Sequence, residues 1–563
     1  MTKTRDLILG PMPYGADPKC VLAMGPWCFA GREAEFPDFE KRFTLAPEPK
    51  WSDAQEPLRA VTALCQRTLG PLADTLAPGN NLPAIYWETL LLPSLAQVCE
   101  QIVERWQRIV ALKERFSTEK LRIEIRPIAP DFAFVDEEDF TLRGALGTEY
   151  NTWLFSILLA QSDLPPLWEC VSGPMVAQTK AREKKKSFRA RFRALIRCLP
   201  FPHLKGVSLF QSLLFSLALL HTTRTPDRSH PLYENAGAGD SLKKLGLTFD
   251  PMPIIRASCI RSLTDLAHPR AISRTKHPRL RCASIAAYED ASYRQSLAIA
   301  RAKGHRLFFV QHGGNYGQVR THCRTALVEY SQHCFITWGW SEYADTPCRF
   351  LPLPYPQLAR IKNAHVERTD TILFVGTEMP LYNYRLDSHP NPTEMLDYRA
   401  AKKRFLDALP KELQRHVVYR PYFPLPSSLE DYPWLARAHP GLARCTGPLT
   451  DHLLASKLLV LDHHGTTLLE AMAANVPLVL YFAKDQWQLT DTCLAYFEEL
   501  FCAGIWFATP EACAQEIAAI WPDIQTWWQA PKRQNARARF VKQYAQTSKT
   551  NETALWRKTL KNL

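Results

Sequence analysis

The segment from Ser456 to Phe482 carries residue types whose spacing suits the binding of an anion. A continuous apolar run from Leu458 to Leu461 predicts a parallel strand covered on both faces. Thr466 and Thr467 then open a predicted helix, and Pro477 starts a second apolar strand. The first turn of a helix leaves backbone N–H groups unpaired, and two hydroxyl groups beside them suit a phosphate. A strand, turn and helix of this kind is where α/β proteins bind nucleotides.

The turn and the start of this helix supply the predicted contacts to the phosphate of a nucleotide. These residues are Asp462, His464, Gly465, Thr466 and Thr467. Glu470, which we place in the first turn of the helix, belongs to the same predicted site, where it could hydrogen-bond ribose hydroxyls. A structural alternative stays open, because Thr466 or Thr467 could cap the helix while Glu470 closes a capping box. The two interpretations are compatible, since a capped helix N-terminus also binds phosphate.

A second polar turn, Gln311 to Gly317, follows the apolar strand predicted at Arg306 to Val310. Its glycines allow the backbone to approach a ligand closely. His312 stands at the carboxyl end of the strand and can titrate near neutrality, so it suits a general base or a phosphate ligand. The other residues predicted to line a cleft here are Gln311, Gly313, Gly314 and Tyr316. The alternative is a turn histidine that is hydrogen-bonded within its own loop.

Two further loops carry candidate phosphate ligands. Thr377 and Arg385 follow the strand predicted at residues 371–376, and Arg420 ends the strand predicted at residues 416–420. An arginine can clamp a phosphate with two parallel hydrogen bonds. A plain surface loop and a surface arginine are the alternatives. The loop after Gly376 lacks the glycine spacing of a dinucleotide fingerprint, which excludes an NAD site.

The motifs predict neither a metal ion nor an organic cofactor. Asp-x-Asp, the metal-binding signature of single-domain sugar transferases, is absent from the predicted strand ends. The H-E-x-x-H, G-x-S-x-G and G-x-x-x-x-G-K-[ST] patterns are also absent, which argues against a metalloprotease, a serine hydrolase and a P-loop protein. We therefore expect a metal-independent site whose anionic charge is stabilised by a helix N-terminus.

The order of the predicted elements indicates an α/β protein with two domains, 1–360 and 361–563, that face a cleft. The later domain alternates strands with helices, which is typical of a parallel sheet. Its helices are predicted at 394–409, at 487–500 and after Pro510, with a loop up to Pro440. The earlier domain has predicted helices at 56–76, 82–116 and 291–303, and strands at 7–9, 21–25, 121–126 and 334–337. Residues 164–281 are expected to form helical insertions and loops, and residues 352–361 a linker.

The formal net charge of +13 is unevenly spread, with a basic run at residues 180–193 that also holds Phe188 and Phe192. Such a run predicts attraction to an anionic membrane surface, with a solvated loop or helix as the alternative. We expect no nucleic-acid partner, because no recognition motif accompanies the charge.

The composition indicates a cytoplasmic protein. No apolar stretch approaches the about 20 residues that a spanning helix needs, and the N-terminus leads straight into a strand, so no signal peptide is expected. The fifteen cysteines are scattered and form no C-x-x-C pair. Reduced core thiols are therefore expected.

Seven segments carry a resemblance to a known family: Leu22 to Cys28, Tyr86-Trp87, Tyr150 to Ser156, Gln311 to Gly317, Trp338 to Trp340, Leu381 to Arg385 and Leu461 to Pro477. They span nearly the whole chain, and the Q-H-G-G-x-Y-G string is the most specific. On these residues the chain resembles the surface-polysaccharide transferases of O-antigen gene clusters. The resemblance implies a GT-B-like glycosyltransferase, with two Rossmann-like lobes facing a cleft and helical insertions in the N-terminal lobe.

Parts of the pattern are similar to two other groups. Gln311 to Gly314 is similar to the W-H-G-T-P turn that supplies a catalytic histidine in CDP-glycerol polymerases of teichoic acid type, which implies a catalytic role for His312. Asp462 to Glu470 is similar to the D-Y-S-S-x-x-x-D turn that binds the donor phosphate in the same enzymes. Thr466 to Met472 looks closer to CMP-Kdo-dependent capsule transferases, which carry a hydroxyl pair followed by F-E-A-L. Glutamate rather than aspartate at position 470 favours this last group.

We therefore predict a cytoplasmic glycosyltransferase, peripheral on the inner membrane face, that builds a bacterial capsule, O-antigen or lipopolysaccharide. Its donor would be a nucleotide-sugar, in particular a CMP-ulosonate such as Kdo, and its acceptor a glycan or a lipid-linked glycan. Three alternatives stay open. They are a CDP-polyol phosphotransferase of teichoic-acid type, a nucleotide-sugar epimerase on the same fold, and a non-catalytic glycan-binding protein.

Overall fold

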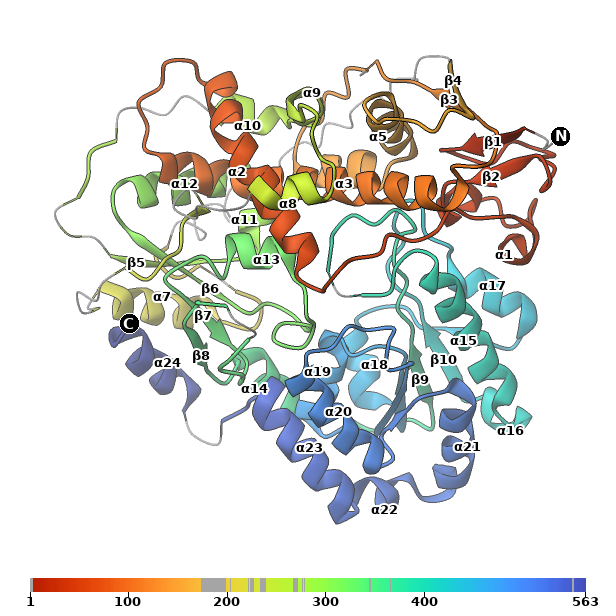
Figure 1. Cartoon of the computed structure of the whole chain (residues 1–563). Helices are drawn as coiled ribbons and strands as arrows, with labels where there is room; N and C mark the ends of the chain where they lie inside the picture. The colour runs from red at the N-terminus through yellow and green to blue at the C-terminus, as the bar shows by residue number, and fades with distance from the viewer. Residues whose placement is uncertain are drawn as a thin grey trace.

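The computed structural model describes most of the chain as three sheets and the helices around them (Figure 1). The described residues are 4–128, 130–173, 199–202, 204–220, 222, 227–232, 239–266, 272–275, 277, 279–343, 346–364, 366–387, 389–548 and 551–563. The basic run at residues 180–193 lies outside them, so its predicted contact with a membrane stays a prediction.

The first sheet has four parallel strands in the order β2-β1-β3-β4. They are β1 (Arg5–Ile8), β2 (Val21–Ala23), β3 (Leu121–Ile125) and β4 (Trp168–Ser172). Two long helices, α2 (Glu56–Leu76) and α3 (Ala84–Phe116), connect β2 to β3 and pack against each other. The other side of α3 meets α5 (Thr148–Ala160), which lies on β3.

The second sheet also has four parallel strands, in the order β5-β6-β7-β8. They are β5 (Leu280–Ala283), β6 (Arg306–Val310), β7 (Cys334–Thr337) and β8 (Phe350–Pro352). Between these strands lie α12 (Ala291–Ala302) and α13 (Cys323–Val328), and both pack on α3. One 33-residue helix, α3, therefore joins the first sheet to the second.

The third sheet has six parallel strands in the order β11-β10-β9-β12-β13-β14. They are β9 (Ile372–Val375), β10 (Val417–Arg420), β11 (Ala443–Arg444), β12 (Leu458–Leu461), β13 (Leu478–Tyr481) and β14 (Trp506–Phe507). Because side chains alternate along a strand, Ile372 and Phe374 of β9 face one core, whereas Leu373 and Val375 face another. Apolar residues therefore fill both faces of the central strands, as the sequence predicted.

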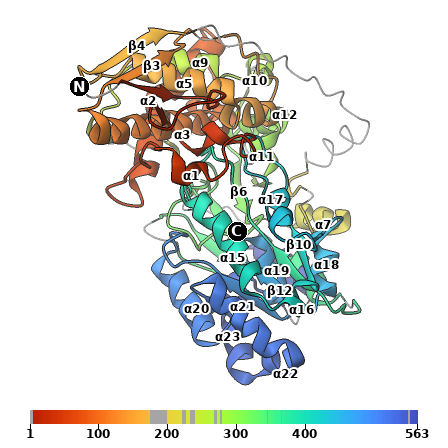
Figure 2. The ribbon, with the colours of Figure 1, turned by 90° about the vertical axis from the view of Figure 1, so that its right-hand side faces the viewer.

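Helices cover both faces of the third sheet. On the side of Phe374 lie α15 (Glu394–Ala408), α17 (Asp431–Ala438) and α21 (Pro510–Ile520). On the side of Leu373 lie α19 (Thr466–Ala474), α20 (Asp491–Cys502) and α23 (Pro531–Tyr544). In the view of Figure 2, α20 to α23 lie at the opposite end of the molecule from β3 and β4. Parallel strands between helices confirm the predicted α/β class.

The remaining described helices are shorter or lie at the periphery. They are α1 (Phe39–Arg42), α4 (Glu137–Asp139), α7 (Leu209–Leu220), α8 (Gly239–Lys244), α9 (Met252–Ala257), α10 (Arg261–Leu266), α11 (Ala286–Glu289), α14 (Pro356–Lys362), α16 (Lys411–Gln414), α18 (Leu449–Ala455), α22 (Ile524–Gln529) and α24 (Glu552–Lys561). None of the helices in the described ranges is both long and apolar enough to cross a membrane.

Four predicted elements were wrong in part. Residues 352–361 hold the helix α14 rather than a linker, and its first residue is Pro356, a residue type common at helix starts. The loop predicted up to Pro440 contains α17. The helix predicted at 487–500 begins only at Asp491, because the Thr490 hydroxyl caps it by accepting a hydrogen bond from the Cys493 N–H. Residues 164–281 contain not only helices and loops but also the edge strand β4 and the first two residues of β5.

The chain crosses twice between the second and third sheets. The first crossing is α14, within which the predicted boundary at residue 360 falls, and the second leads from α23 to α24. The Tyr355 N–H donates to the Gln546 carbonyl (3.3 Å), and the Gln546 N–H donates to the Trp338 carbonyl (2.8 Å). The two crossings therefore lie side by side. Beyond them α24 packs on α7, where the fully buried Trp556 stacks on Phe215 with ring centroids 5.4 Å apart.

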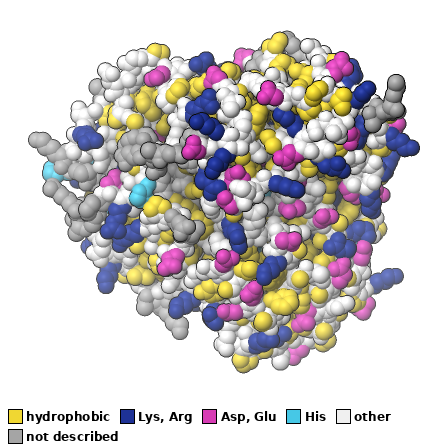
Figure 3. All heavy atoms as spheres, viewed as in Figure 1, with side chains coloured by type: hydrophobic (Ala, Val, Ile, Leu, Met, Phe, Trp, Pro, Cys, Tyr) yellow, Lys and Arg dark blue, Asp and Glu magenta, His cyan; other side chains and the backbone are white. Residues whose placement is uncertain are grey.

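On the face seen in Figure 3, Lys and Arg side chains are interspersed with Asp and Glu side chains. No broad surface of one charge is visible among the coloured atoms of this face. The excess of basic residues therefore does not gather there.

Candidate active site

A pocket of about 430 Å³ lies where loops of the second and third sheets meet. The turns after β6 and β12 and the loop after β9 all reach it, because the carboxyl ends of parallel strands lie at one edge of a sheet. It is lined by Ile285, Tyr288, His312, Gly313, Gly314, Asn315, Tyr316, His322, Arg324, Thr325, Glu329, Thr377, Met379, Arg385, Asp387, Tyr422, His463, Gly465, Thr466, Thr467 and Trp487. We call it the central pocket. It brings together the two polar turns that the sequence placed on opposite sides of a cleft.

A chain of buried hydroxyl and carboxyl groups holds His312. Its Nε2 hydrogen-bonds the Tyr316 hydroxyl, which lies 3.0 Å from Glu329 Oε1, and the Tyr288 hydroxyl lies 2.9 Å from the same oxygen. Burial, followed by the charge of Glu329, raises the pKa of both tyrosines well above the usual range, so both keep their protons. An ionised carboxylate only accepts hydrogen bonds, so Tyr316 donates to Glu329 and accepts from the Nε2–H of His312. This tautomer leaves Nδ1 with the electron pair that a general base needs.

The N-terminus of α19 meets the turn after β6. The Thr466 hydroxyl accepts a hydrogen bond from the Gly314 N–H at 2.8 Å. A Cβ atom added to Gly314 would lie 2.5 Å from the backbone of Gly465 and Thr466, so only glycine permits this approach. The N-cap residue, Gly465, has no side chain to cap the helix. The N–H groups of the first turn can therefore receive an anion.

Asp462 lies beneath the central pocket and orients two residues that line it. Its carboxylate accepts from the Thr377 N–H at 2.9 and 3.1 Å, and His463 Nδ1 lies 2.9 Å from the same carboxylate. The Nζ of the buried Lys402 lies 3.6 Å away. Because Asp462 is itself 1% exposed, it can position Thr377 and His463 but not reach a ligand itself. The prediction that it contacts the phosphate directly does not agree with this position.

Arg324 and Arg385 lie in the lining of the central pocket, each paired with a carboxylate. Arg385 Nε lies 3.2 Å from Asp387 Oδ2, and His322 Nδ1 lies 3.5 Å from Oδ1 of the same carboxylate. Burial opposes the ionisation of Asp387, but His322 and Arg385 outweigh it and hold its pKa well below the usual range. Arg324 pairs with the buried Glu100 at 3.0 Å. An arginine has five N–H donors, so both guanidinium groups keep donors for an anionic ligand.

Besides Asp462, four predicted site residues lie outside the central pocket. Gln311 is buried and holds the loop after β7, because its Oε1 accepts from the backbone N–H of Trp338 at 3.0 Å. Arg420 donates to the Gly447 carbonyl at 2.8 Å. His464 is fully buried beside Gln318, and burial lowers its pKa to about 3. None of these placements supports direct contact with a ligand in this pocket.

Glu470 is the last of these predicted site residues outside the central pocket, and its placement excludes the capping-box alternative. Because α19 begins at Thr466, Glu470 lies in the second turn. Its Oε1 is 3.6 Å from the Lys205 Nζ. It neither closes a capping box nor lines the central pocket, and the Thr466 hydroxyl bonds another segment instead of its own helix.

A family model for LIC12162 family transferases matches residues 5–560 of the sequence. The chain belongs to this family. No curated protein matches the sequence. Two solved structures of the wall teichoic acid polymerase TagF are 11% and 13% identical to this family member, with TM-scores of 0.29 and 0.30. Each match covers 48% of this chain, and 74% and 75% of the TagF chains.

The structure of WaaG, a glycosyltransferase of lipopolysaccharide biosynthesis, is 14% identical, with a TM-score of 0.26. The match covers 60% of this chain and 85% of WaaG. TM-scores this low establish no shared fold. What the family model establishes is that the chain is a transferase.

The central pocket of this family member also contains residues that sequence reasoning missed. They are Tyr288, His322, Arg324, Glu329, Asp387 and His463. The sequence held a signal for His463, because successive side chains of a strand point to opposite faces and this alternation continues into the turn after β12. Asp462 and His464 both turn inward, so the residue between them faces the pocket. For Glu329 and Asp387 the sequence held no local signal.

The described residues of this transferase contain no cluster of three or more His, Cys, Asp or Glu side chains that could hold a metal ion. The central pocket offers a helix N-terminus, two arginines and neutral hydroxyl groups. Such groups bind anionic oxygens by charge and hydrogen bonds.

Proposed function

We propose that this transferase moves a sugar from a nucleotide-sugar donor to a glycan acceptor in the synthesis of a bacterial cell-surface polysaccharide. One observation carries the proposal. His312 and the N-terminus of α19 come from different sheets and line the same pocket. A base and an anion site facing each other is the arrangement that glycosyl transfer between nucleotide and hydroxyl requires. Two parallel sheets around one pocket also support the GT-B-like fold implied by the sequence.

In the proposed reaction the acceptor hydroxyl oxygen bonds the anomeric carbon while the bond from that carbon to the donor phosphate breaks. The hydroxyl proton passes to Nδ1 of His312, which the Tyr316–Glu329 chain holds in the required tautomer. The departing phosphate receives hydrogen bonds from Thr467 and the first turn of α19. Arg385 adds a positive charge to the same wall. Preorganised donors of this kind typically supply several kcal/mol of transition-state stabilisation.

A CMP-ulosonate such as Kdo is the donor that we propose. The support is the sequence Thr466 to Met472, which is similar to that of CMP-Kdo-dependent capsule transferases. Binding of a ligand to the native state raises its melting temperature, so a panel of CMP, CDP, UDP and GDP tests the donor class. We expect the largest shift with CMP. A larger shift with UDP or GDP would exclude a cytidine donor.

Activity is tested by the His312→Ala variant, with CMP-Kdo as donor and release of CMP as the readout. We expect a fall in turnover of about 10²-fold or more, with unchanged nucleotide binding. His230→Ala is the matched control, because His230 is exposed and does not line the central pocket. If His312→Ala retains turnover within a few-fold of the wild type, His312 is not the base.

We also propose that the enzyme works at the cytoplasmic face of a membrane. One support is the basic sequence at residues 180–193. Another is α7, which exposes Phe210, Leu213 and Leu217 by 69%, 51% and 55%, beside α24 with its exposed Lys558. Apolar side chains flanked by cations suit an anionic lipid surface. Co-sedimentation should require anionic vesicles and weaken with salt; equal sedimentation with neutral vesicles would contradict this.

A further inference from the structure

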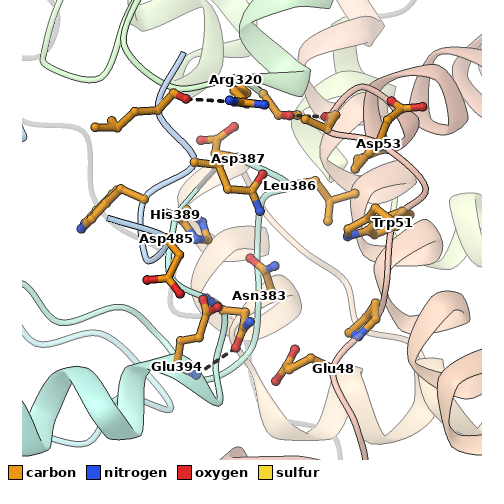
Figure 4. A pocket seen from close by; sticks show the side chains of 18 of the residues that line it. Glu48, Trp51, Asp53, Arg320, Asn383, Leu386, Asp387, His389, Glu394 and Asp485 are labelled. Atoms are coloured by element: carbon orange, nitrogen blue, oxygen red, sulfur yellow. Dashed lines mark hydrogen bonds between the residues drawn. The ribbon is translucent and has the colours of Figure 1, made fainter. Parts of the chain in front are cut away.

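A second pocket, of about 580 Å³, opens beside the central pocket (Figure 4). The two pockets share Asp387 and Trp487 in their walls. Most of the lining of this outer pocket comes from residues 48–57, 383–394 and 484–494. The outer pocket is therefore adjacent to the central pocket.

Trp51 gives the outer pocket a flat apolar surface. Trp51 is half-buried, and Trp487 is 4% exposed. Trp487 donates its indole N–H to the Tyr398 hydroxyl at 3.3 Å and packs on His464 with ring centroids 4.6 Å apart, so it offers a ligand little surface. Aromatic surfaces with a few placed polar groups are typical of pockets for small organic ligands.

Two buried polar atoms of this lining are hydrogen-bond acceptors that receive no hydrogen bond from the described residues. Asn383 Oδ1 and His389 Nε2 are buried and have no hydrogen-bond partner within the described ranges. Burial, followed by the charge of Arg385, lowers the pKa of His389 to about 4, so its ring is neutral at pH 7. Its Nδ1 lies 3.1 Å from the Pro390 carbonyl and donates to it, which leaves Nε2 as an acceptor. Figure 4 shows Asn383 and His389 in the middle of the lining, between Trp51 and Asp485.

The charges of the outer pocket disfavour an anion. Carboxylates line it at Glu48, Glu394 and Asp485, and Asp485 is exposed. The cations of its described lining are already paired, Arg320 with Asp491 at 2.8 Å and Lys484 with Glu498 at 3.1 Å. A phosphate or carboxylate in this pocket would meet like charges and acceptor atoms without donors.

We infer that the outer pocket binds the acceptor, and that this acceptor is a neutral or amino-substituted glycan. Sugar hydroxyl and ammonium groups supply the donors that Asn383 and His389 lack, and a sugar ring packs on Trp51. The inference rests on the proposed function, because it assigns the acceptor to the pocket next to the donor. Because Asp387 lines both pockets, an acceptor in the outer pocket would lie next to the pocket that holds His312.

Calorimetric titration of three trisaccharides into the full-length protein tests the inference. The probes are the trimers of N-acetylglucosamine (neutral), glucosamine (cationic) and galacturonic acid (anionic). We expect the first two to bind with millimolar affinity and the third not to bind. Trp51→Ala should weaken both by about 10-fold or more, whereas Trp521→Ala, at the far end of the third sheet, should not. Asp485→Lys, at an exposed position, should weaken the glucosamine trimer most.

Equal binding of the galacturonate trimer would overturn the inference, as would no binding of the first two trimers or unchanged binding in folded Trp51→Ala. If Trp51→Ala does not fold, Asp485→Lys decides. The nucleotide panel is a separate measurement on the central pocket. If CMP stabilises the protein but none of the trimers binds, the proposed function stands and this inference fails. If the trimers bind as expected but no nucleotide stabilises the protein, the proposed function fails while the outer pocket is still shown to bind glycans.

Discussion

The hydroxyl group of Tyr316 should control the activity of His312 without touching the substrate. Tyr316 is 5% exposed, and its ring stacks between His322 and Phe335 with centroids 5.5 and 5.4 Å away. Tyr316→Phe keeps these ring contacts and removes only the hydroxyl between His312 and Glu329. The Nε2–H of His312 then loses its hydrogen-bond partner and faces only Glu329 Oε1, at 3.6 Å, so the tautomer with a free Nδ1 is less favoured.

A positioned general base contributes about 10²- to 10⁴-fold to a rate. The Tyr316 hydroxyl sets only the tautomer and orientation of that base, so we expect a fall in turnover of about 10- to 100-fold, or about 1.4–2.7 kcal/mol. Nucleotide binding should not change. Because Tyr316 acts through His312, the double variant with His312→Ala should be no slower than His312→Ala alone.

The assay is release of CMP from the donor under saturating acceptor, with nucleotide affinity measured in parallel. Tyr343→Phe is the matched control, since its buried hydroxyl donates to the Val319 carbonyl at 2.9 Å and lies outside the central pocket. If Tyr316→Phe is as active as this control, or if its effect adds to that of His312→Ala, the hydroxyl does not act through His312.

Three further outcomes are expected. Replacing Thr466 and Thr467 together by Val should weaken nucleotide binding by about 1–3 kcal/mol in calorimetry, because hydrogen bonds to a charged phosphate are lost; unchanged affinity would remove both from the donor site. Activity should persist in excess EDTA, and loss of activity that magnesium restores would refute stabilisation by the helix N-terminus alone. Burial lowers the pKa of His464 from 6.5 to about 3, so the neutral folded state loses stability as the pH falls from 6.5 toward 3. Urea titrations should show His464→Gln losing about 2 kcal/mol less than the wild type between pH 7 and pH 5.

The local elements of the site could be predicted from sequence because each is encoded within a short segment. The apolar run of β12, the polar turn and the start of α19 follow one another within about ten residues of the chain. Placing His312 and Thr466 in one pocket rested on two expectations, that each follows the carboxyl end of a parallel strand and that the two domains face a cleft. Their direct contact, through the Gly314 N–H, could not be predicted, since it depends on how two sheets pack.

The direction of individual side chains was harder to predict. Asp462, His463 and His464 are equally polar, yet only His463 lines the central pocket, because β12 continues its alternation into the turn. Glu329 and Asp387 became part of the site through contacts with Tyr316 and His322, which come from other segments. The edge strand β4 was missed, since its five residues, Trp168 to Ser172, hold polar side chains and an irregular burial pattern.

The pairing of the two chain crossings limits how the halves of the pocket can move. A body joined to another by a single linker can swing in any direction. Here the segment around Tyr355 and the segment around Gln546 pass between the second and third sheets together and are hydrogen-bonded to each other. The helix α3, which packs on helices of the second sheet, also reaches the third-sheet loops, because Arg105 donates to the Asn383 carbonyl at 2.9 Å. Together with these contacts, the Gly314–Thr466 hydrogen bond would have to break before the second and third sheets could move apart at the pocket.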